Sequence, residues 1–261
     1  MDKDFLWLHL KDLPYFRAML RAVEARFFQD LVLPSPTLDI GCGDGHFALT
    51  TFNHKIDVGL DPDHGTILEA AQRSNYLVLI QGDAGELPFP TGYFASAVSN
   101  SVLEHIPHLE HVIREASRVL KPGAHFYFCV PNHRFNASLS LSRWLSNMGF
   151  PKLAAGYQHF YDRLARHIHL DSPGVWQNRL EEHGFEMVAS LDYFSPQALR
   201  VLEWGHLFGI PSLLIRKITG RWILMKKEWN FVLIRPILQR YYDEGYPHPD
   251  GVCTFFVARK L

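Results

Sequence analysis

The sequence lacks the features that mark several large classes of protein. Its 26 basic and 27 acidic side chains leave a formal net charge of −1, whereas a protein that binds nucleic-acid phosphates normally carries a strong basic excess. No uncharged apolar run approaches the roughly 18 to 20 residues that a membrane-spanning helix requires. We therefore expect no nucleic-acid partner and no transmembrane segment.

Paired metal ligands and a secretion signal are also missing. The cysteines are Cys42, Cys129 and Cys253. They do not form the C-x-x-C pair of a zinc site, and His167-Ile168-His169 has no third ligand at a suitable spacing, so we expect no metal. The start Met1-Asp2-Lys3-Asp4 lacks the basic and apolar stretches of a signal peptide. A reduced, cytoplasmic protein is expected.

The apolar residues that are present predict alternating strands and helices. Helical spacing over residues 5–30 indicates a helical segment that ends at Pro34-Ser35-Pro36. Strands are expected at 37–40, 56–60, 76–80, 94–99, 125–130, 185–191 and 252–258. Helices between most of them indicate βαβ units and a parallel sheet. The alternation lapses over 131–171 and again over about 60 residues before the last strand, which predicts two insertions.

A glycine-rich turn follows the first predicted strand. Gly41, Gly43 and Gly45 allow a ligand to approach the backbone closely, because no Cβ intervenes. A dinucleotide fold of the G-x-G-x-x-G type would need a third glycine where this chain has His46. The spacing therefore predicts a cofactor turn of another kind.

This turn, preceded by Asp39, resembles motif I of the class I S-adenosylmethionine-dependent methyltransferases of the small-molecule type. Three further segments resemble the signatures of the same family, in the same order. They are Gln81 to Phe89, Phe94 to Ile106 and Arg114 to Gly123. The resemblance covers about 100 residues, from 36 to 132, and is weaker beyond them.

The resemblance implies a Rossmann-like, doubly wound α/β fold with seven strands in the order 3-2-1-4-5-7-6, the last strand antiparallel. The residue pattern itself predicts a helical N-terminal cover at 1–34, ahead of a cofactor-binding domain at 35–261. A lid insertion is expected at about 133–172 and a helical insertion at about 196–250.

The implied cofactor is S-adenosylmethionine, which becomes S-adenosylhomocysteine. Asp61 ends a strand where a carboxylate can accept hydrogen bonds from both ribose hydroxyls, and Asp83 is suited to the adenine amino group. Ser99 and Asn100 would lie beside the methionine part. The full set of predicted cofactor residues is Asp39, Gly41, Cys42, Gly43, Gly45, Asp61, Pro62, Asp83, Ala84, Ser99 and Asn100.

Methyl transfer is an in-line displacement that depends mainly on alignment and on the exclusion of water. For an oxygen or nitrogen acceptor a base helps, and histidine suits that role because its pKa lies near working pH. His105 and His167 are the candidate bases; the alternative for His105 is a purely structural hydrogen bond at a helix start. His133, Tyr157 and Tyr161 are candidate acceptor-binding residues.

Within the second insertion, apolar residues follow steps of three or four and fall on one helix face. They are Leu214, Ile218, Trp222, Met225, Trp229 and Val232, with Arg216, Lys217, Lys226 and Lys227 mostly elsewhere. This segment either caps the acceptor pocket or makes peripheral contact with a membrane surface at about 213–235.

We expect a small, hydrophobic or lipid-like acceptor. Two alternatives remain at this point: a non-catalytic S-adenosylmethionine-binding or scaffold protein, and an NAD(P)-dependent oxidoreductase. His46 and the acid at Asp83 disfavour the oxidoreductase.

Overall fold

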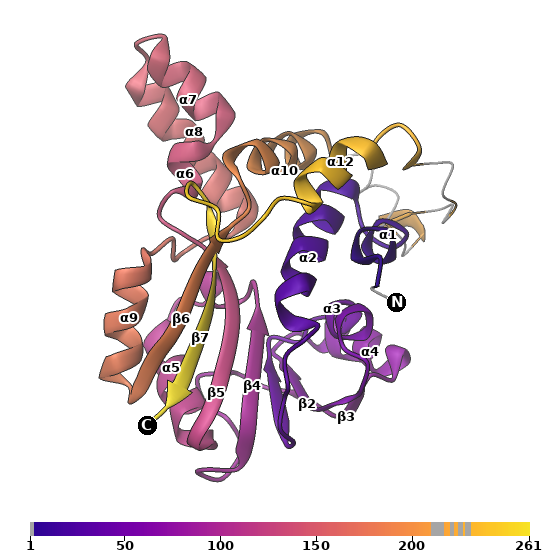
Figure 1. Cartoon of the computed structure of the whole chain (residues 1–261), viewed down its shortest axis with the longest axis vertical. Helices are drawn as coiled ribbons and strands as arrows, with labels where there is room; N and C mark the ends of the chain where they lie inside the picture. The colour runs from indigo at the N-terminus through magenta and orange to yellow at the C-terminus, as the bar shows by residue number, and fades with distance from the viewer. Residues whose placement is uncertain (1–2, 210–216, 220–221, 224–226, 228–230) are drawn as a thin grey trace.

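A computed structural model of the chain describes residues 3–209, 217–219, 222–223, 227 and 231–261. It contains a seven-stranded sheet in the order β3-β2-β1-β4-β5-β7-β6 (Figure 1). The strands are β1 (Thr37–Ile40), β2 (Ile56–Asp61), β3 (Tyr76–Gln81), β4 (Phe94–Asn100), β5 (Leu120–Pro131), β6 (Phe185–Tyr193) and β7 (Cys253–Lys260). β1 to β5 pair in parallel, and β7 runs antiparallel to both β5 and β6. The predicted fold and strand order are confirmed.

Helices cover both faces of this sheet. On one face α5 (Leu109–Val119) and α9 (Pro173–Glu182) enclose a core around the fully buried Trp176. On the other face α2 (Tyr15–Phe28) and α3 (His46–Thr51) form a second core that extends to β7. α4 (His64–Arg73) packs beside β2 and β3. β1 is buried along its whole length, as the central strand of a sheet covered on both faces must be.

The N-terminal segment forms two helices rather than one. α1 (Phe5–Leu10) ends before a turn, and α2 begins after Pro14. Proline lacks a backbone N–H and its ring clashes with the preceding helical turn, so the apolar spacing over 5–30 could not continue as one helix. Five apolar residues of α2 are fully buried against the rest of the chain: Ala18, Met19, Ala22, Ala25 and Phe28.

The chain beyond β5 forms three helices that the sequence did not indicate: α6 (Phe135–Ser138), α7 (Ser140–Asn147) and α8 (Pro151–Ala165). After β6 come α10 (Pro196–Phe208) and α12 (Arg235–Tyr242). These helices lie beyond the carboxyl ends of the parallel strands (Figure 1). They therefore stand over the edge of the sheet where α/β folds bind their ligands.

The apolar stripe predicted for the second insertion falls partly outside the described residues. Leu214, Met225 and Trp229 lie there, as do Arg216 and Lys226. Of the described stripe residues, Ile218 and Val232 are exposed and Trp222 is half-buried. In the described part of the chain, the helices are too short or too polar to cross a bilayer.

Two helical glycines differ sharply in their surroundings. A Cβ on Gly205 of α10 would lie 2.3 Å from the Cβ of Phe16 on α2, whereas a Cβ on Gly156 of α8 would meet nothing within 4 Å. We expect Gly205→Ala to lower the free energy of unfolding by about 1–3 kcal/mol through overpacking. Gly156→Ala should raise it by roughly 0.5–1 kcal/mol, because alanine favours the helix. Urea titrations measure both; equal effects of the two substitutions would contradict the close packing of α10 on α2.

Candidate active site

The glycine-rich turn after β1 is held in place by the end of β2. The backbone N–H groups of Gly41 and Cys42 both donate to the carbonyl of Leu60, at 2.8 and 3.0 Å. The next glycine N–H, of Gly43, donates to Asp61 Oδ2 at 3.0 Å. Gly43 has a φ of +53°, and a Cβ there would face open space. The turn therefore presents bare backbone to a cavity of about 650 Å³, which we call the turn cavity.

Two carboxylates line the turn cavity at the ends of neighbouring strands. Asp61 Oδ1 accepts hydrogen bonds from the Thr66 hydroxyl and the Asp63 N–H, each at 3.0 Å. Asp83, beyond β3, accepts from the Gly85 N–H at 2.7 Å. These bonds fix both carboxylates without using all of their acceptor positions. Each can still accept a hydrogen bond from a ligand hydroxyl or amino group.

A third carboxyl, that of Asp39, lies deeper in the wall of the turn cavity. Burial raises its pKa to about 7, and the neighbouring charge of Asp61 acts in the same direction. The hydroxyl of Tyr76 donates to Asp39 Oδ2 at 2.6 Å and opposes the rise. Tyr76 thus holds Asp39 behind the turn, a role for which the sequence offered no signal.

Most of the predicted cofactor residues line the turn cavity. The lining members are Asp39, Gly41, Cys42, Gly43, Asp61, Pro62, Asp83, Ala84 and Asn100. Gly45 and Ser99 do not line it. Gly45 precedes α3 with a φ of +73°, and the buried Ser99 hydroxyl donates to the Ile40 carbonyl at 2.9 Å. These two residues therefore lie behind the residues that line the turn cavity.

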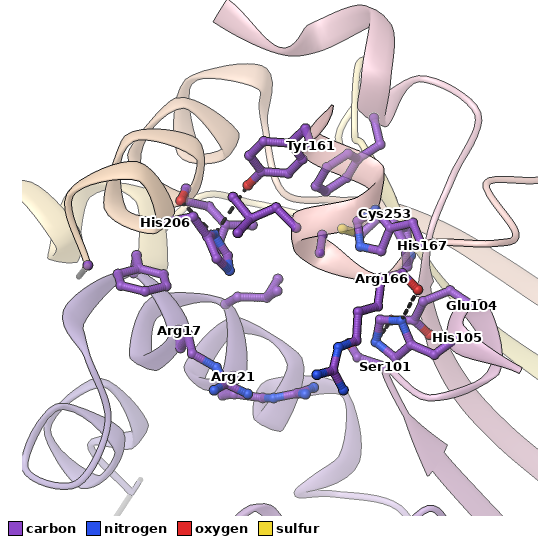
Figure 2. Close-up of a pocket in the computed structure, with 18 of the residues that line it drawn as sticks. Arg17, Arg21, Ser101, Glu104, His105, Tyr161, Arg166, His167, His206 and Cys253 are labelled. Atoms are coloured by element: carbon purple, nitrogen blue, oxygen red, sulfur yellow. Dashed lines mark hydrogen bonds and ion pairs between the residues drawn. The ribbon is translucent and has the colours of Figure 1, made fainter. Parts of the chain in front are cut away.

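A second cavity of about 550 Å³ adjoins the first and lies below α6, α8 and α10. We call it the second cavity. Much of its lining is apolar: Phe16, Leu20, Pro131, Phe135, Leu164 and Leu202. Tyr161, His167 and His206 add polar groups to it (Figure 2). Such a mixture suits a largely apolar molecule with a few polar groups.

The two cavities share a boundary that is rich in cationic side chains. Arg17 and Arg21 of α2, Arg166 after α8, Ser101 and His105 line both cavities. Figure 2 shows the three arginines on the same side of the pocket. Arg21 is held by Glu24 at 2.8 Å. The guanidinium of Arg166 makes no hydrogen bond or ion pair with the described residues, so it is available to a ligand.

Glu24 of α2 organises this boundary from within the core. It is only 1% exposed. Besides Arg21, its carboxylate accepts from Asn100 Nδ2 at 2.8 Å, from the Ser101 hydroxyl at 2.7 Å and from the Tyr193 hydroxyl at 3.2 Å. A buried charge is tolerated only when it is paired and hydrogen-bonded. Glu24 thereby joins α2, the end of β4 and β6 at one point.

His105 is placed to accept a proton at the boundary. Its Nδ1 lies 2.9 Å from the carbonyl of Arg166, which can only accept, so Nδ1 carries the hydrogen and Nε2 keeps its lone pair. Burial lowers the pKa of His105 from its ordinary value. Its neighbour Glu104 lines the second cavity, and burial raises the pKa of that carboxyl to about 8. Glu104 Oε2 is buried and has no hydrogen-bond partner among the described residues.

His167 is the other candidate base, and it lies deeper. Its ring stacks on that of His105 with centroids 5.8 Å apart and meets Phe135 edge-on. Burial, reinforced by the charges of His105 and His206, lowers its pKa to about 3. A group with so low a pKa is neutral at pH 7 but a poor proton acceptor.

The predicted acceptor residues are dispersed. Tyr161 lines the second cavity, and its hydroxyl lies 3.2 Å from His206 Nδ1. Tyr157 lines neither cavity and donates to the buried Glu203 at 2.8 Å. His133 is exposed and also lines neither cavity. Of these three residues, the structure thus brings only Tyr161 to the second cavity.

Several lining residues were not singled out from the sequence. Arg17 and Arg21 are four residues apart on one helix face, a spacing that marks neighbours on a helix but no ligand. Arg166 has a φ of +60° at the end of α8, in a segment for which no helix was predicted. Among the described residues, no three His, Cys, Asp or Glu side chains are grouped closely enough to hold a metal ion.

Comparison with known proteins gives a consistent result. A family model described as a methyltransferase domain matches residues 12–190. The chain is 30% identical over 172 residues to the chloroplastic 2-methyl-6-phytyl-1,4-hydroquinone methyltransferase of Spinacia oleracea, covering 61% of this chain and 48% of that protein. It is 34% identical over 105 residues to a fatty-acid O-methyltransferase of Mycolicibacterium smegmatis, covering 38% of each. The chain thus matches about half or less of the length of these relatives.

A solved structure supports the fold alone. It is an S-adenosylmethionine-dependent methyltransferase from Thermotoga maritima, with a TM-score of 0.56 and 18% identity. The match covers 94% of this chain and 91% of that one.

The low pKa of His167 predicts how acid affects stability. The folded-state pKa of about 3 lies below the ordinary value of 6.5, so the unfolded chain takes up the proton first as pH falls. At pH 5 this costs on the order of 2 kcal/mol of unfolding free energy. His167→Gln cannot titrate, and we expect its loss of stability between pH 7.5 and pH 5 to be smaller by about that amount. Urea unfolding at both pH values measures the difference; parallel losses in both proteins would contradict the assigned burial.

Proposed function

The chain belongs to the S-adenosylmethionine-dependent methyltransferases, and from that premise we propose that it transfers a methyl group to a small apolar acceptor. One observation carries the proposal: a cavity suited to the donor adjoins a largely apolar cavity, and both share the boundary at Ser101, His105 and Arg166. A donor and an acceptor that fill the two cavities would meet there. Such placement is the main requirement for a methyl displacement.

The residues of the turn cavity fit S-adenosylmethionine. Its size is in the range of small-molecule sites, and Gly43 leaves open space beside the backbone. Asp61 would hold the ribose hydroxyls, Asp83 the adenine amino group and Asn100 the methionine part. When bound, S-adenosylmethionine supplies a methyl group on a positively charged sulfur. The chain's own contribution is to orient the two reactants and to exclude water.

The second cavity would hold the acceptor. Its apolar lining favours a hydrophobic or lipid-like molecule, and two relatives are named for acceptors of that kind, a phytyl hydroquinone and a fatty acid. Arg166 would face the polar or negatively charged end of such a molecule. An acceptor anion there also relieves the repulsion between the guanidinium groups and a cationic sulfur.

His105 is the proposed base. Its hydrogen bond to Arg166 leaves Nε2 without a hydrogen, 3.6 Å from Glu104 Oε1. Nε2 would take a proton from an acceptor hydroxyl. Glu104 faces the same cavity, and because its carboxyl is protonated at neutral pH it would donate a hydrogen bond to the acceptor rather than remove a proton. A non-catalytic protein that only binds the cofactor would use neither group.

The domain division expected from the sequence is part of this proposal. Residues 1–34 would cover the domain at 35–261, and the insertions at 133–172 and 196–250 would build the acceptor side. They contribute Tyr161, Leu164 and Leu202 to the second cavity. Membrane contact through 213–235, with a cytoplasmic location, also stays a proposal.

Binding of the donor is tested at Asp61. Asp61→Asn places an NH₂ group where a carboxylate oxygen accepts, and we expect about tenfold to a hundredfold weaker S-adenosylmethionine binding by calorimetry. Asp63→Asn is the matched control, because Asp63 caps α4 and asparagine caps a helix equally well. Absence of S-adenosylmethionine binding to the wild-type protein would refute the proposal. Absence of methyl transfer from labelled donor to oleate or a phytyl hydroquinone, with binding intact, would favour a cofactor-binding scaffold.

Catalysis by His105 predicts a pH dependence. The groups facing it are Glu104, His167 and the three boundary arginines. Since burial lowers its pKa, kcat/KM should be constant near neutrality and fall in acid, through a pKa below 6.5. We expect His105→Gln to bind S-adenosylmethionine normally, to lose about 10²-fold or more in kcat, and to lose the acidic limb of the profile. If kcat of His105→Gln lies within about twofold of the wild-type value, His105 is not the base and its role is structural.

A further inference from the structure

The hairpin of α7 and α8 projects away from the rest of the molecule (Figure 1). Its far end carries large apolar side chains that contact water: Trp144, Met148, Phe150 and Leu153. We call these four residues the hairpin tip. Trp144 is 55% exposed and Leu153 is 60% exposed. A contiguous exposed apolar patch on a projecting element is unusual in a protein whose surface meets only water.

The charge around the hairpin tip has one sign. Residues 139–161 contain no Asp or Glu, whereas Arg143 and Lys152 flank the tip and are both exposed. The first acid after them, Asp162, accepts two hydrogen bonds from Asn136 Nδ2 at 3.0 and 2.9 Å. Ordinary soluble surfaces mix both signs of charge. Apolar side chains among cations without acids match the interface of an anionic lipid bilayer.

The apolar surface continues from the hairpin tip to the second cavity. Leu153, Phe160 and Leu164 are seven and four residues apart, so they lie on one face of α8. All three are exposed, and Leu164 also lines the second cavity. One end of this stripe is therefore at the tip and the other at the proposed acceptor site.

We propose that the α7–α8 hairpin docks on an anionic lipid bilayer and that apolar acceptors reach the second cavity along the exposed face of α8. The docking surface is distinct from residues 213–235. The docking step stands on the hairpin alone, whereas the route for the acceptor rests on the proposed function. The hairpin tip enters the headgroup region, and Arg143 and Lys152 remain at its anionic surface.

Vesicle co-sedimentation with the full chain tests the docking step. We expect wild-type protein to sediment with vesicles of phosphatidylcholine and one-third phosphatidylglycerol, and much less with phosphatidylcholine alone. Trp144→Ser with Phe150→Ser should weaken binding about tenfold or more, and Arg143→Glu with Lys152→Glu should do the same. Leu68→Ser is the matched control, because Leu68 is an exposed apolar residue on α4, 52% accessible. This variant should bind vesicles as the wild type does.

Several results would overturn the docking step. One is that the wild-type protein fails to bind anionic vesicles. Another is that the wild type and both hairpin variants bind them equally. A wild-type dimer in size-exclusion chromatography that the tip variant abolishes would instead assign the surface to a second copy of the chain. Circular dichroism and calorimetry with S-adenosylmethionine would check that each variant is folded. We expect all of them to fold, because every substituted position is exposed.

The acceptor route is measured separately. With oleate in anionic vesicles, the tip variant should lose most of its methyl transfer, whereas with water-soluble octanoate it should match the wild type. Equal loss with both substrates would overturn the route. No transfer by any protein to either substrate, with vesicle binding intact, would count against the proposed function and leave docking supported.

Discussion

The buried carboxylate of Glu24 is the interaction on which the boundary between the two cavities depends. Removing a charge from water costs several kcal/mol, which only close charged and polar partners offset. Here the partners come from α2 itself, from the end of β4 and from β6. Helix α2 is thereby tied to the sheet at the place where the proposed donor and acceptor would meet. The same network positions Arg21, Asn100 and Ser101, all of which line a cavity.

The boundary combines neutral histidines with permanent cations. Burial lowers the pKa of His105, His167 and His206, so these rings carry no charge near neutrality. The arginines keep theirs under all conditions. Glu24 offsets the charge of Arg21, whereas the guanidinium of Arg166 has no ion-pair partner among the described residues. In the proposed reaction the sulfonium becomes a thioether while the acceptor's proton moves to His105, so the net charge of the site stays the same.

The fold was predictable because its signals are local. A strand, a glycine turn and a helix occupy adjacent residues, and the carboxylates Asp61 and Asp83 follow directly on apolar strands. The acceptor side was not predictable, because its members converge from distant segments. Glu24 and Tyr193 are 169 residues apart, and neither has a sequence neighbour that suggests the other. Over 133–172 three helices were missed, two of them because α6 and α7 are only four and eight residues long and so show few repeats of an apolar pattern.

The glycine turn lies close against the loop that follows β4. A Cβ on Gly41 would lie 2.4 Å from Val102 Cγ1, so the Val102 side chain packs directly against the backbone of the turn. The loop that carries Val102 also carries Ser101, Glu104 and His105. A shift of the turn on donor binding would press on the Val102 side chain, and through it on the loop that lines the second cavity. We therefore expect each ligand to change the affinity of the chain for the other.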